Sequence, residues 1–118
     1  MPRAASGTLV AVGLLDRLRR RRPGQVRRSD PADAAHLREW TAQRRGVEGF
    51  VEPPTMTQPV TLLLVAHDGE WTRRRVPSVK WAHDFCNGLG LPSYDAAVVG
   101  VPHRMREYNQ RQRGASGR

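Results

Sequence analysis

An uninterrupted apolar run from Val60 to Ala66 constrains the fold of this chain more than any other segment. Both alternating faces of the run, Val-Thr-Leu-Leu-Leu-Val-Ala, are almost wholly apolar. A strand of this kind is covered on both sides, so we expect it in the centre of a sheet. The dipeptide Asp68-Gly69 favours a tight hairpin turn after it. Residues 70–76 are therefore predicted to return as an antiparallel strand.

The returning strand carries three consecutive arginines. Alternation places Trp71, Arg73 and Arg75 on one face and Arg74 on the other. Three adjacent guanidinium groups are poorly suited to burial on both sides. We therefore expect this strand at an edge or on an open face of the sheet.

Helices are predicted on both sides of the hairpin. Asp30-Pro31-Ala32-Asp33 has the capping residue, the proline and the acidic first turn of a helix start, and Gly46 is the expected terminator. Ser78 caps a second predicted helix, whose apolar stripe includes Cys86 and which ends near Gly88 and Gly90. A third main strand is expected over 94–101, with Ala97, Val98 and Val99 buried, and a last helix starts at Pro102.

The order of these elements predicts an α+β fold: a small mixed sheet of three to four strands, made of a hairpin and a strand–helix–strand unit, with packed helices. We expect a single domain over 30–113. A basic tail at 1–29, partly helical or disordered, precedes it, and 114–118 is expected to be a disordered end. The apolar run at 8–15 lacks the flanks of a signal peptide, so a cytoplasmic location is expected.

Positive charge is concentrated at the two ends of the sequence. The 118 residues include 20 basic and 11 acidic side chains, for a net charge of +9. Residues 1–28 hold eight arginines and one aspartate, and 104–118 hold five arginines and one glutamate. The middle of the chain is nearly neutral. Arginine-rich ends favour polyanionic partners, because guanidinium groups form paired hydrogen bonds with phosphate.

The charge pattern predicts a small basic protein that binds RNA or a ribonucleoprotein through phosphate contacts, without catalytic residues or a cofactor. Seven arginines of the segment 17–28, called the basic tract below, are expected to set the affinity. On the folded body, a flat indole beside guanidinium groups can stack a base and hold its phosphates. The predicted nucleic-acid contacts are Arg17, Arg19, Arg20, Arg21, Arg22, Arg27, Arg28, Trp71, Arg73, Arg74, Arg75, Arg104 and Arg106.

Three segments, GVEGFVEP, VTLLLVAHDGEWTRRRVPS and LPSYDAAVVGVPHRMREYN, resemble a family of short, uncharacterised actinobacterial proteins that often carry the label oxidoreductase. The resemblance implies a redox activity with an unidentified cofactor as an alternative function. The chain has no GxGxxG turn for a dinucleotide and no P-loop. The resemblance supplies no catalytic residue.

Two further alternatives and several candidate sites remain open. Residues 8–22 have the pattern of an interfacial anchor for an anionic membrane surface, and the basic tract also suits an acidic protein partner. His67, Asp68 and Glu70 cluster around the turn, where a metal site or an acid–base pair competes with simple turn chemistry. Cys86 is the only cysteine, which excludes an internal disulfide, and its place on the apolar stripe favours burial.

Overall fold

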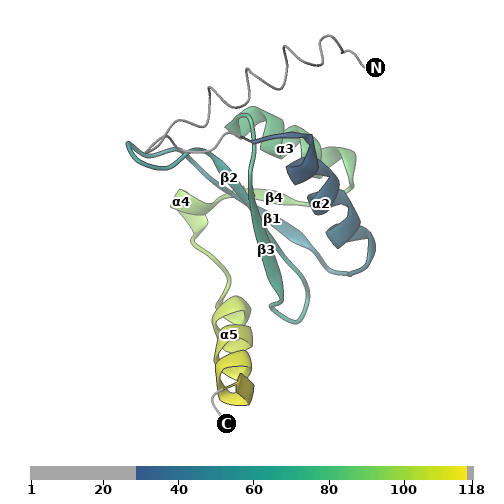
Figure 1. The fold of residues 1–118 in the computed structure, drawn as a ribbon, viewed down its shortest axis with the longest axis vertical. Coiled ribbons are helices and arrows are strands. Elements are labelled where there is room, and N and C mark those ends of the chain that lie inside the picture. The colour runs from purple at the N-terminus through teal and green to yellow at the C-terminus, as the bar shows by residue number, and fades with distance from the viewer. Residues whose placement is uncertain (1–28, 117–118) are drawn as a thin grey trace, which may run out of the picture.

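A mixed four-stranded sheet in the order β3-β2-β1-β4 forms the centre of the fold (Figure 1). The computed structural model describes residues 29–116. β1 pairs antiparallel with β2, β2 pairs antiparallel with β3, and β1 pairs parallel with β4. The four strands are β1 Glu48–Glu52, β2 Thr61–Val65, β3 Trp71–Arg75 and β4 Ser93–Asp95. Together with its helices, the sheet confirms the predicted α+β class.

The central place of β2 confirms the prediction from its apolar run. Leu62, Leu63, Leu64 and Val65 are each fully buried, because β2 has a strand on either side and covered faces above and below. The arginine-bearing β3 lies at an edge of the sheet, also as predicted. β1 is the second central strand.

Two helices cover one face of the sheet (Figure 1). α2, Pro31–Ala42, begins with a capping box in which Asp30 and Asp33 each accept a hydrogen bond from the other's backbone N–H. α3, Val79–Gly88, begins at the predicted cap, Ser78. Leu37 and Trp40 of α2 pack with Ala82 and Cys86 of α3, and with Val51, Leu62 and Leu64 of the sheet, in one hydrophobic cluster.

The opposite face of the sheet has a smaller cluster. Phe50, Leu63 and Val65 pack there against Met105, with Trp71 and Ala96 at its margin. Met105 belongs to α5, His103–Ser116, whose remaining turns project beyond the sheet (Figure 1). α5 runs through Gly114 to Ser116, where the sequence predicted irregular structure. No helix among residues 29–116 is long and apolar enough to cross a membrane.

The prediction of a third main strand over 94–101 is wrong in its extent. β4 ends at Asp95, and Ala96–Val99 form the short helix α4. The Asp95 carboxylate caps this helix by accepting a hydrogen bond from the Ala97 N–H at 2.8 Å. The valines expected in the core are consequently outside it, with Val98 79% and Val99 55% exposed. β4 pairs with β1 across the sheet from β3, so the crossover through α3 joins the two edge strands.

The hairpin between β2 and β3 forms where the sequence predicted it, but Asp68-Gly69 is not the central pair of the turn. The Gly69 N–H donates to the Ala66 carbonyl at 3.0 Å, so His67 and Asp68 occupy the two corners. Gly69 follows with a φ of 93°. A Cβ at this position would collide with the Arg104 carbonyl group, so α5 approaches the turn closely only because residue 69 is glycine.

Candidate nucleic-acid interface

Arg75 lines two hollows at the end of β3. The first, the α2–α3 hollow, has a volume of about 350 Å³ and is lined by Ser29, Asp30, Pro31, Ala34, Arg75, Pro77 and Trp81. The second, the arginine hollow, has a volume of about 160 Å³ and is lined by Gln58, Thr61, Arg73, Arg74 and Arg75. Because Arg75 belongs to both, a cationic side chain of the sheet lies beside the start of α2.

The basic tract joins the described chain at this place. Its arginines, residues 17–28, lie outside the described residues, as do the contacts predicted for them. Ser29 follows Arg28 directly and lines the α2–α3 hollow with Arg75. The described chain therefore begins, at Ser29, beside the arginine-bearing end of β3.

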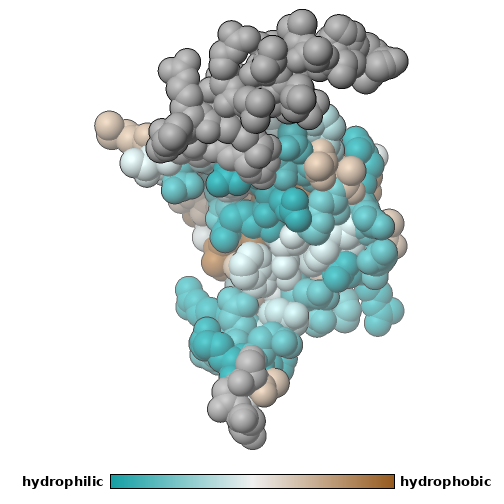
Figure 2. All heavy atoms as spheres, viewed as in Figure 1, coloured by the Kyte–Doolittle hydropathy of each residue, from teal (hydrophilic) through white to brown (hydrophobic). Residues whose placement is uncertain are grey.

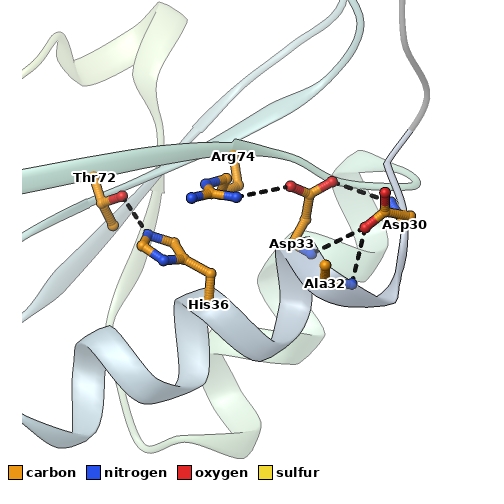
Figure 3. Close-up of polar contacts among 6 residues, drawn as sticks. All are labelled: Asp30, Ala32, Asp33, His36, Thr72 and Arg74. Carbon is orange, nitrogen blue, oxygen red and sulfur yellow. Dashed lines mark hydrogen bonds and ion pairs between the residues drawn. The ribbon is translucent and has the colours of Figure 1, made fainter.

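Arg74 points toward the N-terminal part of α2 (Figure 3). Its Nη1 lies 3.4 Å from Oδ1 of Asp33, longer than the roughly 2.8 Å of a strong charged hydrogen bond. In the same view, His36 Nε2 lies 2.7 Å from Thr72 Oγ1. His36 is therefore part of the contact between α2 and β3. Burial first, and then the nearby Arg74 charge, hold the pKa of His36 below its usual value.

Arg73 is paired within the sheet. Its Nε and Nη2 donate to the two carboxylate oxygens of Glu52 at 2.7 and 3.0 Å, and its guanidinium lies 5.3 Å from the centre of the Trp71 ring. Glu52 also accepts a hydrogen bond from the Thr61 hydroxyl at 2.6 Å. Two of the three guanidinium nitrogens of Arg73 therefore already donate to a carboxylate of the protein itself.

Trp71 also has partners inside the fold. Its indole N–H donates to Asn109 Oδ1 of α5 at 2.8 Å, and its ring packs at the margin of the smaller hydrophobic cluster. The structure thus brings Trp71 and Arg73 together, as predicted, but in an arrangement that holds α5 against β3. We assign Trp71 a packing role and leave it out of the interface.

The two predicted contacts on α5 differ from each other. Arg104 donates to Glu48 Oε1 at 2.8 Å and to the carbonyls of Ala66 and Val65 at 2.9 and 3.3 Å, so it holds α5 to the sheet. Arg106 is exposed. The Arg104 contacts were invisible to sequence reasoning, because its partners are 38 to 56 residues away.

Arg75 differs from Arg73 and Arg74 because no carboxylate is within ion-pair distance of it among the described residues. Its Nε is buried and has no hydrogen-bond partner in this part of the chain. Leaving a buried donor unsatisfied costs about 1–3 kcal/mol. Where it is coloured, the face of the molecule seen in Figure 2 is largely hydrophilic, with scattered hydrophobic spheres. Of the three consecutive arginines of β3, Arg75 is therefore the one without a carboxylate partner among residues 29–116.

Asp68 and Glu70, two of the three polar residues that cluster at the hairpin, take part in a turn hydrogen bond and an ion pair. Glu70 accepts a hydrogen bond from Arg44 at 2.8 Å, and the Asp68 carboxylate accepts one from the Glu70 N–H at 3.0 Å. This backbone hydrogen bond is the main cause that lowers the pKa of Asp68. Residues 29–116 contain no group of three or more His, Cys, Asp or Glu side chains placed to hold a metal ion.

Cys86 lies in the core, as predicted. Its side chain is fully buried, and burial raises the pKa of the thiol to about 11.

Tyr94 lines a shallow hollow of about 230 Å³ beside α4, together with Glu48 and Phe50. On α5, His103 Nε2 lies 3.4 Å from Glu107 Oε2. Arg111 of the same helix donates to the Asp68 carbonyl at 2.9 Å.

No family model, no curated protein and no solved structure matches this chain. The function is therefore inferred from its own geometry and charge. Sequence reasoning missed Gln58 and Thr61 as parts of the arginine end of the sheet. A signal for Thr61 was present, because the antiparallel hairpin pairs it with Arg75.

Proposed function

We propose that the protein binds RNA through the phosphate groups of its backbone, with the basic tract as the main contact and the arginine end of β3 as its continuation on the folded body. The observation that carries the proposal is the shared position of Ser29 and Arg75 in the α2–α3 hollow. A phosphate chain held by the tract has a further guanidinium within reach at the point where the tract enters the fold.

The charge of the neighbourhood supports this proposal. The basic tract has seven arginines and no carboxylate. At the end of β3, Arg73 and Arg74 face the carboxylates of Glu52 and Asp33, and Asp30 lines the α2–α3 hollow with Arg75. The excess of positive charge in this neighbourhood therefore comes from the basic tract. Each phosphate contact releases condensed counterions, so binding to RNA is expected to weaken steeply with salt.

The test is the salt dependence of RNA binding by the full chain. Replacing the four consecutive residues Arg19, Arg20, Arg21 and Arg22 with Ala should lower the affinity for a single-stranded RNA and flatten the slope of log affinity against log salt. The slope should fall by about 0.7 for each phosphate that the variant no longer neutralises. Fluorescence anisotropy at several salt concentrations measures both quantities.

A matched control separates the tract from net charge alone. The control variant replaces four exposed cations outside the tract with Gln, which removes the same amount of charge. These residues are Arg38, Arg45, Lys80 and Arg113. We expect this control to keep most of the salt slope. Equal slopes for the wild type and the tract variant would overturn the proposal. So would binding to anionic vesicles that RNA does not displace, because it would indicate a membrane surface as the partner.

A further inference from the structure

The arginine hollow is lined by side chains that all carry hydrogen-bond donors. Gln58 precedes β2, Thr61 begins it, and Arg73, Arg74 and Arg75 come from the neighbouring strand β3. Thr61 and Arg75 are direct cross-strand partners, so the sheet fixes their relative position. The Thr61 hydroxyl already donates its hydrogen to Glu52. The Gln58 amide and the three guanidinium groups around one concavity form a setting for an oxyanion.

The size of the hollow limits what it accommodates. Its volume of about 160 Å³ corresponds to roughly five water molecules at about 30 Å³ each. That space accommodates one phosphate group with a few waters. The hollow is thus suited to a single charged group of a larger ligand.

Two of the three guanidinium groups already have carboxylate neighbours. Arg73 is paired with Glu52 through two hydrogen bonds, and Arg74 lies 3.4 Å from Asp33. The Glu52 carboxylate has its charge balanced by Arg73 and accepts a further hydrogen bond from Thr61. Among the described residues, Arg75 has no carboxylate within ion-pair distance, and its buried Nε has no hydrogen-bond acceptor.

We infer that the arginine hollow binds one phosphate group, with Arg75 as the principal donor and Gln58 at the rim. An oxyanion there places a negative charge beside three guanidinium groups, of which Arg75 has no ion pair among the described residues. The inference rests on the proposed function in that the phosphate belongs to RNA. It comes either from an end of the RNA, as a monoester, or from within it, as a diester.

The first experiment uses inorganic phosphate with the full chain. We expect saturable phosphate binding that chloride at equal ionic strength does not reproduce, measured by the chemical-shift change of the Thr61 backbone amide, which every variant below retains. Arg75→Gln should weaken this binding at least tenfold. Arg45→Gln removes the same charge near the other end of α2, roughly 18 Å away by helix length, and should change it less than twofold. Equal effects of the two substitutions, or no saturable binding by the wild type, would overturn the inference.

Arg75→Lys and Gln58→Ala keep the inference testable if Arg75→Gln fails to fold. Lysine keeps the charge but loses the planar donor set, so phosphate binding should weaken severalfold while the salt slope of RNA binding is unchanged. Gln58 is exposed, so its substitution by Ala should leave unfolding unchanged and weaken phosphate binding. Wild-type phosphate affinity in both variants would exclude the hollow as the site.

Two RNA oligonucleotides distinguish the source of the phosphate and separate this inference from the proposed function. Loss of affinity in Arg75→Gln only for a 5′-phosphorylated RNA indicates a terminal monoester, and equal loss for a 5′-hydroxyl RNA indicates an internal diester. If RNA binding depends on the basic tract but neither Arg75→Gln nor inorganic phosphate affects it, this inference and the continuation onto β3 fail, and RNA binding through the basic tract stands. If phosphate binds at the hollow and RNA does not bind, the proposed function fails.

Discussion

Arg104 and Glu48, 56 residues apart in the sequence, form an ion pair with an Nη2–Oε1 distance of 2.8 Å. Glu48 begins β1 and Arg104 lies in the first turn of α5, so the pair ties the last helix to a central strand. Arg104 also donates to the carbonyls of Ala66 and Val65. One arginine at the basic end of the sequence thus has a structural role.

Arg104→Met is expected to destabilise the protein by about 1–3 kcal/mol, because it removes charged hydrogen bonds from a half-buried site and leaves their acceptors without a donor. Urea unfolding measures the change. Arg106→Met is the matched control, since Arg106 is exposed on the same helix and its loss removes the same charge. If the two variants unfold at the same urea concentration, the contacts of Arg104 do not contribute to stability.

Gly69→Ala is expected to cost more stability than Gly90→Ala. Both glycines have a positive φ, 93° and 73°, which costs an alanine about 1–2 kcal/mol. Only at Gly69 would the new Cβ also collide with the Arg104 carbonyl, whereas nothing lies within 4 Å of a Cβ at Gly90. Displacing α5 should add roughly 1–3 kcal/mol in the Gly69 variant. Equal losses of unfolding free energy would show that α5 yields to the added methyl without cost.

Lowering the pH from 7.5 to 5.5 is expected to reduce the free energy of unfolding through His36. Its pKa in the fold is below the ordinary value of 6.5, so near pH 6 the unfolded chain binds more protons than the folded one. Stability then falls as the pH falls. His36→Gln keeps a donor toward Thr72 and should show a smaller decline between the two pH values.

His67→Gln serves as the control for this pH effect, because His67 is exposed at the hairpin. It should lose as much stability on acidification as the wild type does. Urea unfolding at both pH values gives the comparison. A decline in His36→Gln that parallels the wild type would assign the pH dependence to other groups.

Cys86 is expected to be unreactive toward a thiol reagent in the folded protein. With a pKa of about 11, only about one thiol in a thousand is ionised at pH 8, and the side chain is fully buried. Absorbance of the aromatic disulfide reagent's product follows the reaction. Unfolding in urea should release one reactive thiol per chain, and fast labelling without urea would contradict the burial.

Local patterns in the sequence were sufficient for several elements. The apolar run identified β2 as central, and the run of arginines identified β3 as an edge strand. The Asp30–Asp33 segment located the start of α2 and Ser78 that of α3. Each of these features depends on residues a few positions apart, through side-chain alternation or a capping hydrogen bond. The same reasoning failed at 94–101, where Asp95 caps α4 and the valines favoured an extended chain in the sequence alone.

The sequence by itself determined the α+β class, the hairpin, the starts of α2 and α3 and the uneven charge of the chain. Only the tertiary structure decided which arginines have carboxylate partners: Arg104 with Glu48, Arg73 with Glu52 and Arg44 with Glu70, and Arg75 with none among residues 29–116. Coulomb attraction and hydrogen bonding act over a few ångströms in space, and strand order sets those distances. Spacing along the chain does not contain that information.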